Sequence, residues 1–95
     1  MFTGIVQGIA KVTEIIASPG LNTLVIDFPG ARVEGVTIGA SVAINGTCLT
    51  VTRQDGTHLY FDAMQETLRL TTLGELSPGD TVNFERAARI GDEIG

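Results

Sequence analysis

The residues best suited to chemistry in this sequence surround the dipeptide Asn45-Gly46. Asparagine followed by glycine is typical of the two-residue turn of a β-hairpin, because both residues tolerate positive φ. If these two residues form the turn, Ser41 faces Thr50 and Ala43 faces Cys48 across the paired strands. Side chains alternate along a strand, so these four residues share one face of the sheet. The apolar side chains of Val42, Ile44, Leu49 and Val51 share the other face.

A patch of hydroxyls, a thiol and small side chains suits a flat heteroaromatic ligand. The small side chains leave room for a ring, while hydroxyls and backbone amides can meet its polar edge. The following strand could form the floor of such a pocket, with either Phe61 and Ala63 or Asp62 and Met64 turned toward the patch. The length of the turn at Asp55-Gly56 decides between these two pairs. The patch is therefore a candidate ligand pocket.

Each of these residues also has a purely structural alternative. A lone cysteine is commonly a small buried apolar residue, which is the alternative for Cys48. Ser41 and Thr50 could form a cross-strand hydroxyl pair with structural value only. Asp62 could cap a short helical turn that follows it, and Glu66 could belong to the same local set of hydrogen bonds.

Six short strands must position these residues. The chain alternates short apolar runs with turn signals such as Ser18-Pro19-Gly20 and Ser77-Pro78-Gly79, which is typical of β-structure. The segment 31–39 is predicted to form a loop or a helical turn, and 65–73 a single short helical turn. Six antiparallel strands in a chain this small would expose long edges unless the sheet closed, so we predict an all-β barrel. The predicted strands are 4–16, 21–28, 41–44, 47–53, 58–64 and 81–85.

Composition excludes several classes of function. The chain has 95 residues, which is enough for one domain with one core, and its net charge of −5 disfavours nucleic acid as a partner. Its one basic cluster, Arg86 and Arg89 beside Glu85, indicates a solvated strand end. His58 and Cys48 are too few for a metal site, so no metal is expected.

The location follows from cysteine usage and hydropathy. A single cysteine, Cys48, excludes an intramolecular disulfide and removes the usual sign of an oxidising compartment. The chain has no apolar stretch near the ~20 residues that a membrane span needs, and its first residues do not resemble a secretion signal. We therefore expect a cytoplasmic protein with no membrane partner.

Several motifs together resemble the lumazine-binding domain of the riboflavin synthase family. Up to residue 68 these are Met1-Phe2-Thr3-Gly4-Ile5-Val6, the hairpin Asn45-Gly46-Thr47-Cys48-Leu49-Thr50-Val51 and the run Glu66-Thr67-Leu68. Near the end they are Leu73-Gly74, Gly79-Asp80, the strand Val82-Asn83-Phe84-Glu85-Arg86-Ala87 and Gly91-Asp92-Glu93-Ile94-Gly95. The motifs span essentially the whole chain, and their joint order makes the resemblance specific.

The resemblance implies a six-stranded antiparallel Greek-key barrel that occurs twice in the full enzyme. Residues 1–95 then form the first lumazine-binding barrel domain, with the second repeat absent, and the full-length enzyme is a homotrimer. It also implies ligand-binding residues in three segments. They are Gly4, Ile5 and Val6; Cys48, Leu49 and Thr50; and Asp62, Ala63, Met64, Gln65, Glu66 and Thr67.

The implied reaction is the dismutation of two molecules of 6,7-dimethyl-8-ribityllumazine to riboflavin and a pyrimidine, with no cofactor required. Ser41, Cys48 and Thr50 are the candidates for assisting proton transfer or polarising the acceptor ring. The resemblance also implies that the productive pair of ligands lies between the first domain of one subunit and the second domain of another in the full enzyme. We therefore expect this chain to bind lumazine or riboflavin with little or no turnover, and to form a homodimer in which a second copy covers the exposed surface.

Two functions remain as alternatives to the synthase domain. One is a non-catalytic lumazine or flavin carrier, resembling the optical proteins of luminous bacteria, which share this barrel. Those carriers tend to depart from the enzyme at the hairpin with the reactive side chains, whereas Ser41 and Cys48 here are as in the enzyme. The other is a barrel kept only for assembly or stability, with an empty pocket.

Overall fold

Six strands and one short helix make up the regular structure of the described chain. The structure is a computed structural model and describes residues 2–87. Helix α1 (Gln65–Leu70) follows the fifth strand, and 3₁₀ turns lie at Gly30–Arg32 and Thr72–Glu75. The strands are β1 (Gly8–Ser18), β2 (Leu21–Asp27), β3 (Ser41–Ile44), β4 (Thr47–Asp55), β5 (His58–Met64) and β6 (Thr81–Arg86).

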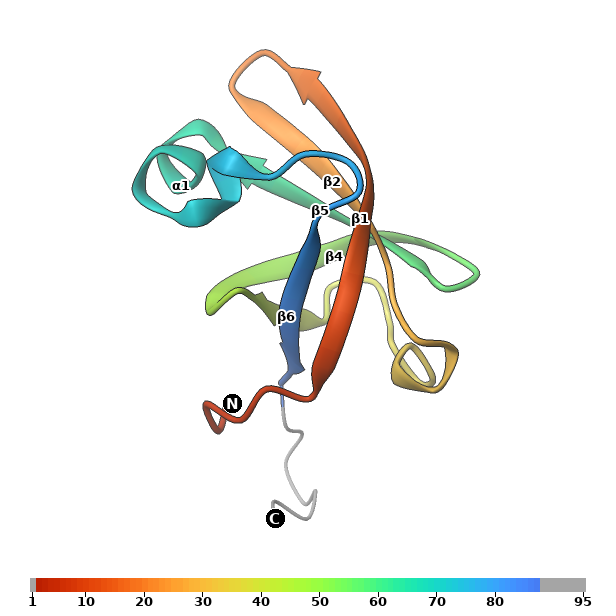
Figure 1. Ribbon diagram of the computed structural model, residues 1–95. Coiled ribbons are helices and arrows are strands. Elements are labelled where there is room, and N and C mark those ends of the chain that lie inside the picture. The colour runs from red at the N-terminus through yellow and green to blue at the C-terminus, as the bar shows by residue number, and fades with distance from the viewer. Residues whose placement is uncertain (1, 88–95) are drawn as a thin grey trace.

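The strands close into a barrel in the order β1-β2-β5-β4-β3-β6, with β6 paired to β1. All neighbours are antiparallel, and the meander β3-β4-β5 is flanked by β2 on one side and β6 on the other, which is Greek-key connectivity. Figure 1 shows β1 and β6 running side by side, with α1 projecting from one side of the barrel. The predicted six-stranded antiparallel Greek-key barrel with one short helical turn is confirmed. Closure removes the exposed edges that an open sheet of this size would present.

The hairpin of β3 and β4 has the predicted turn and register. Asn45 (φ +49°) and Gly46 (φ +82°) both have positive φ, which a type I′ turn requires at its two central residues. Ser41 lies opposite Thr50, and Ala43 lies opposite Cys48. This register follows from the turn, because a tight hairpin turn leaves only one pairing of the strands that it joins.

The core fills the inside of the barrel. Inward-facing residues of every strand contribute, including Val12, Ile26 and Leu59, each at most 1% exposed. Phe28 packs edge-on against Phe84, with ring centroids 4.8 Å apart. Each large side chain buried in this way stabilises the fold by roughly 2 kcal/mol. A ligand must therefore bind outside the barrel, since its interior is occupied by side chains.

The first strand begins later than predicted. The pattern favours a strand from residue 4, whereas β1 begins at Gly8 and runs to Ser18. Gly4 has φ +83°, which is incompatible with an extended strand, and residues 3–4 make hydrogen bonds to a side chain instead of a strand ladder. β1 also has a bulge between Val12 and Glu14, so the pattern of its apolar residues changes face along its length.

The second tight turn lies one residue further along than the sequence suggests. β4 extends to Asp55, which pairs with His58, so Gly56 and Thr57 are the central residues of the turn. Gly56 alone has positive φ (+60°), as expected for the first central residue of a type II′ turn. A bulge between Val51 and Arg53 shifts the register of β4 against β5.

Within residues 2–87, the structure has no helix with the length and apolar character to cross a membrane.

Candidate functional site

The patch predicted around the Asn45-Gly46 turn lies on the outer surface of the barrel. Cys48 and Thr50 are exposed, and Ser41 and Ala43 are half-buried between their neighbouring strands. The alternative that Cys48 is a buried core residue is therefore wrong. The opposite face of the hairpin points into the core and carries Val42, Ile44, Leu49 and Val51, none more than 6% exposed.

The structure decides which side chains of β5 share the outer face with this patch. Leu59, Phe61 and Ala63 point into the core, whereas Asp62 and Met64 are exposed on the outside. Phe61 and Ala63 therefore cannot form the floor of an outer pocket with their side chains. Of the two pairs that the sequence left open, Asp62 and Met64 lie on the face of the patch.

Beside the patch, β4 and β5 are not paired. In the described chain, the pairing of β4 with β5 begins only at Val51 and continues toward the turn. Val51 exchanges backbone hydrogen bonds of 2.8 and 2.9 Å with residues 39–40, on the β3 side. Peptide groups alternate in direction along a strand, so those of Cys48 and Thr50 point the other way, toward β5.

The same alternation places a peptide group of β5 at this gap. The Gln65 N–H donates a hydrogen bond of 3.0 Å to the Gly20 carbonyl, on the β2 side of the strand. The preceding peptide group, that of Met64, therefore points toward β4. Backbone donors and acceptors of Cys48, Thr50 and Met64 thus converge on the gap between β4 and β5. This is an arrangement that can bind the polar edge of a flat ring.

Glu85 brings the N-terminal segment to the other side of the patch. Glu85 lies opposite Ala43 on the neighbouring strand and is only 6% exposed. Its Oε2 accepts hydrogen bonds from the Thr3 N–H (2.5 Å) and the Thr3 hydroxyl (2.8 Å), and its Oε1 accepts one from the Gly4 N–H (3.0 Å). The bond from the Thr3 N–H, together with those from the Thr3 hydroxyl and the Gly4 N–H, holds the pKa of Glu85 below its ordinary value.

The interpretation of Glu85 and Arg86 as a solvated strand end is wrong. Glu85 is covered by the N-terminal segment, and Arg86 is half-buried, with its guanidinium donating to the carbonyls of Arg32 (3.3 Å) and Glu34 (2.7 Å). Strand alternation assigns Glu85 to the outer face, where a carboxylate is normally solvated. Its burial depends on contacts with residues about eighty positions away, for which the sequence has no local signal. The third residue of that cluster, Arg89, lies outside the described residues.

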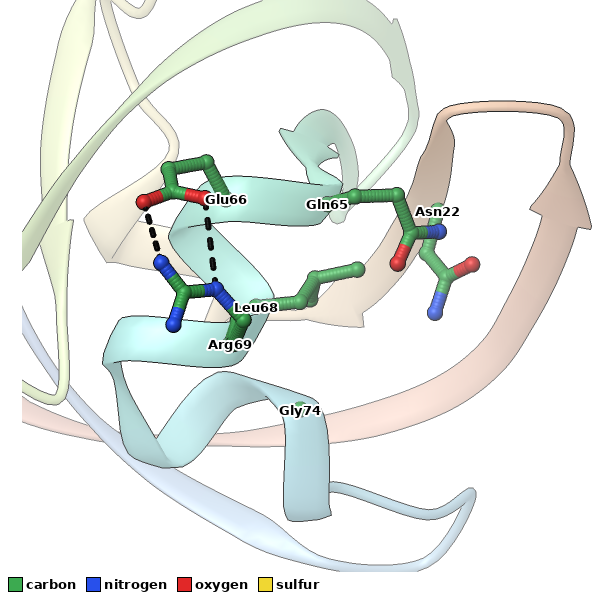
Figure 2. Close-up of a pocket in the computed structure, with 6 residues that line it drawn as sticks. All are labelled: Asn22, Gln65, Glu66, Leu68, Arg69 and Gly74. Carbon is green, nitrogen blue, oxygen red and sulfur yellow. Dashed lines mark hydrogen bonds and ion pairs between the residues drawn. The ribbon is translucent and has the colours of Figure 1, made fainter.

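A shallow pocket of about 410 Å³ lies beside α1, as Figure 2 shows. Its lining comes from the start of β2, from α1 and from the 3₁₀ turn after it: Asn22, Gln65, Glu66, Leu68, Arg69 and Gly74. Figure 2 shows the Gln65 side chain reaching toward Asn22, while Glu66 and Arg69 pair with each other on the other side of the helix, at 2.6 Å. Two predicted ligand residues, Gln65 and Glu66, line this pocket, but none of the patch residues does.

Asp62 and Glu66 do not cap the helix. Asp62 accepts a hydrogen bond of 2.7 Å from the Thr23 hydroxyl on β2. The N-cap of α1 is Met64, whose side chain makes no capping hydrogen bond, and Glu66 pairs with Arg69. The capping role considered for Asp62 is therefore wrong, whereas Glu66 does make local hydrogen bonds, with Arg69 and not with Asp62. Both carboxylates are exposed: that of Asp62 lies beside the gap between β4 and β5, and that of Glu66 lies on α1.

Not all residues of the three predicted ligand segments turn their side chains to the outside of the barrel. In the view of Figure 1, α1, the start of β4 and the N-terminal segment all lie along the left side of the barrel. Ile5 and Val6 are exposed there, and Thr67 is half-buried in α1. Leu49 and Ala63 point into the core, so only their backbone could contact a ligand. Within residues 2–87, no group of three or more His, Cys, Asp or Glu side chains is placed to bind a metal ion.

Comparison with known proteins identifies the family. Residues 3–87 match the lumazine binding domain family. The chain is 56% identical to riboflavin synthase of Escherichia coli over all 95 residues, which is 45% of the length of that protein and its N-terminal half. It is also 40% identical to the blue fluorescence protein of Aliivibrio fischeri, covering 54% of it. The chain therefore spans about half the length of the curated relatives that it matches.

Two solved structures that are similar to this chain are complexes with small molecules. LumP complexed with riboflavin has a TM-score of 0.88 and 37% identity, and the match covers all of this chain and 51% of that one. LumP complexed with 6,7-dimethyl-8-(1'-D-ribityl)lumazine has a TM-score of 0.85 and 38% identity over 92% of this chain and 49% of that one. With a barrel of this topology and a family match over nearly its whole length, this chain belongs to the lumazine-binding domain family.

Proposed function

We propose that this chain is the first of the two lumazine-binding barrels of a riboflavin synthase and that it binds 6,7-dimethyl-8-ribityllumazine and riboflavin. The observation that carries the proposal is the register of the β3–β4 hairpin, which puts Ser41, Cys48 and Thr50 on one outer face. Beside them, unpaired stretches of β4 and β5 offer backbone groups to a ring. The 56% identity to the N-terminal half of a riboflavin synthase supports the same function.

The ligand would bind with its ring at the gap between β4 and β5. Peptide groups of Cys48, Thr50 and Met64 would bond the polar edge of the pteridine or flavin ring. Gly4–Val6 would contact it from the β6 side, and residues 65–67 of α1 would contact the ribityl chain. Short side chains at Ala43 and Ser41 leave space for the flat ring. Leu49 and Ala63 would contribute through their backbone, while Asp62 would offer a carboxylate at the rim.

The full enzyme would transfer a four-carbon unit between two bound lumazines. One ring loses a proton from its 7-methyl group, the other accepts the addition of a nucleophile or hydroxide, and the products are riboflavin and a pyrimidine. The reaction is a dismutation, so it needs no external oxidant or cofactor. Holding the two rings face to face supplies roughly 7 kcal/mol of the rate enhancement through orientation. Ser41, Cys48 and Thr50 are the proposed groups for proton transfer or polarisation of the acceptor ring.

The isolated chain would bind ligand with little or no turnover. Its site is on the outer surface, with Cys48 and Thr50 exposed, so one face of a bound ring stays uncovered. A second barrel would supply the second ring, and the full-length enzyme would be a homotrimer. Without the second barrel, we propose that two copies of this chain form a homodimer. Sedimentation that detects monomer alone at high concentration would contradict the dimer.

The cellular location of the protein is a further proposal. A single cysteine and the relationship to a riboflavin synthase favour a cytoplasmic protein. Fractionation of cells that express the tagged protein would test it, with the soluble cytoplasmic fraction as the expected result.

Titration with riboflavin and with the lumazine, followed by fluorescence quenching, tests the binding site. The parent chain is expected to quench both ligands, and Thr50→Ala to bind them several-fold more weakly, because each lost hydrogen bond contributes about 1 kcal/mol. Thr81→Ala is the matched control, since Thr81 is exposed on β6 and pairs with Lys11 away from the patch. Equal quenching by the parent and Thr50→Ala removes the Thr50 hydroxyl from the proposed contacts.

A non-catalytic carrier is the second candidate function. The 40% identity to the blue fluorescence protein favours it, as do the LumP structures with bound lumazine and riboflavin. Ser41 and Cys48, which are as in the enzyme, favour the synthase. Formation of riboflavin from the lumazine by the two-domain protein separates the two functions, because a carrier binds the lumazine without converting it.

A further inference from the structure

We propose that Glu85 is a positioning residue for the ligand site, whose carboxylate holds the segment Thr3–Val6 against the outer face beside Cys48. The inference rests on the proposed function, because it concerns the same site. Glu85 lies opposite Ala43, and Ala43 lies opposite Cys48, so the carboxylate is one strand away from the patch on the side opposite the gap. Glu85 acts through the N-terminal segment, and no contact of its own with the ligand is invoked.

Hydrogen bonds to β6 fix the segment at both ends. At one end, the Glu85 carboxylate accepts from Thr3 and Gly4, and the Thr3 hydroxyl accepts from the Ile5 N–H at 3.2 Å. At the other end, the Gln7 N–H donates to the Phe84 carbonyl at 2.8 Å. Ile5 and Val6, two of the predicted ligand residues, lie between these ends. Their placement therefore depends on both attachments.

Burial does not hold this segment in place. Residues 3–7 are all exposed, and none belongs to the hydrophobic core. Ile5 is 63% exposed and Val6 is 55% exposed, so their apolar surface contributes little to fixing them. The attachment at Thr3 and Gly4 consists of bonds to an ionised carboxylate, and such bonds are about twice as strong as those between neutral groups. The backbone at Gly4 is left-handed (φ +83°), so the chain changes direction directly after the two N–H groups that donate to the carboxylate.

Loss of the carboxylate should reduce binding without unfolding the barrel. If the segment occupies its binding-competent position only part of the time, the apparent Kd rises by the inverse of that fraction. Glu85→Gln keeps the shape of the side chain but loses the charge and one acceptor oxygen. We expect the riboflavin Kd of Glu85→Gln to be roughly tenfold higher than that of the parent, which corresponds to a segment in place about a tenth of the time. Glu75→Gln, at an exposed carboxylate in the 3₁₀ turn after α1, is the matched control.

Deletion of residues 2–6 separates positioning from a direct role. In the shortened chain, Glu85 has no segment to hold, so Glu85→Gln should leave the riboflavin Kd unchanged within twofold. If Glu85→Gln still raises the riboflavin Kd roughly tenfold in the shortened chain, Glu85 acts on the ligand or on the barrel itself, and the proposal is overturned. Non-additive effects of this kind identify residues that act through one another.

Amide NMR supplies a readout that a merely structural role would not move. The Thr3 and Gly4 amide signals should shift in Glu85→Gln, while amides of the core strands, such as Leu24 and Phe61, stay in place. Riboflavin should perturb the Gly4–Val6 amides in the parent and much less in Glu85→Gln. A parent that does not bind riboflavin overturns the proposed function. If the parent and Glu85→Gln bind riboflavin equally tightly, only the proposed role of Glu85 is overturned.

Discussion

Cys48 and Glu85 lie on opposite sides of Ala43 on the outer face of the barrel. Each pairs directly with Ala43 in an adjacent strand, so the backbones at Cys48 and Glu85 are two strand spacings apart, or roughly 10 Å. Cys48 belongs to the predicted patch, and Glu85 holds the N-terminal segment. The relationship places residues near position 4 and residues near position 50 on either side of Ala43, as the proposed ligand site requires.

The turn at Asn45-Gly46 should be sensitive to a side chain at Gly46. Gly46 has φ +82°, where an L-residue is strained by about 1–2 kcal/mol. Gly46→Ala should lower the free energy of unfolding by that amount in urea and weaken riboflavin binding, because the turn sets the register of the patch. Gly30→Ala is the control, since Gly30 does not have positive φ and an added Cβ would lie 3.9 Å from Thr57. Equal stability of both variants would contradict the strain at Gly46.

The junction between α1 and the following 3₁₀ turn should not tolerate a side chain at Gly74. A Cβ there would lie 2.5 Å from the Leu68 carbonyl oxygen, which is backbone and cannot move alone. Gly74→Ala should therefore lower the free energy of unfolding by about 1–3 kcal/mol and disturb the pocket beside α1. Chemical denaturation measures the loss, with Gly30→Ala again as the control. A variant as stable as the parent would show that the two segments separate easily.

The Glu85 carboxylate should make stability depend on pH in the acid range. Its pKa in the folded protein is below the ordinary value, chiefly because of the hydrogen bond from the Thr3 N–H. The unfolded chain then binds more protons than the folded one between the two pKa values, so this contribution is present above the ordinary pKa of about 4.5 and is lost as pH falls through the lowered one.

Urea denaturation of the parent and Glu85→Gln at several pH values tests this dependence. The stability difference between them should be largest near neutral pH and should shrink below pH ~4.5. Glu75→Gln serves as the control for the loss of a surface carboxylate. A difference that stays constant from pH 7 to pH 3 would be incompatible with a depressed pKa at Glu85.

Exposure of Cys48 gives a direct assay of the site. The thiol is exposed in the folded chain, so a disulfide reagent should modify it without denaturation. Riboflavin at ten times its Kd should slow the modification about tenfold if the ring covers the thiol, because only about a tenth of the sites are then free. Cys48→Ser provides the blank. An unchanged rate with bound riboflavin would place the ring away from Cys48.

The features of this protein that depend on neighbouring residues could be predicted from its amino-acid sequence. Asn45-Gly46 specified a type I′ turn, and the turn specified the pairing of Ser41 with Thr50 and of Ala43 with Cys48. Alternation then separated an outer patch from an inner apolar face, as the structure confirms. Turn geometry and strand alternation act over a few residues, so a single sequence is enough to predict them.

The surroundings of that patch depend on bulges and on contacts between residues far apart in the chain, which become known only from the folded structure. The bulge at residue 52 and the turn at Gly56-Thr57 determined that Asp62 and Met64 share its face. The burial of Glu85 required contact with Thr3, which is 82 residues away in the chain. Periodicity carries no information on contacts at that separation, because they arise when the closed barrel brings the two ends of the chain together. The same carboxylate would be solvated if the N-terminal segment were not folded over it.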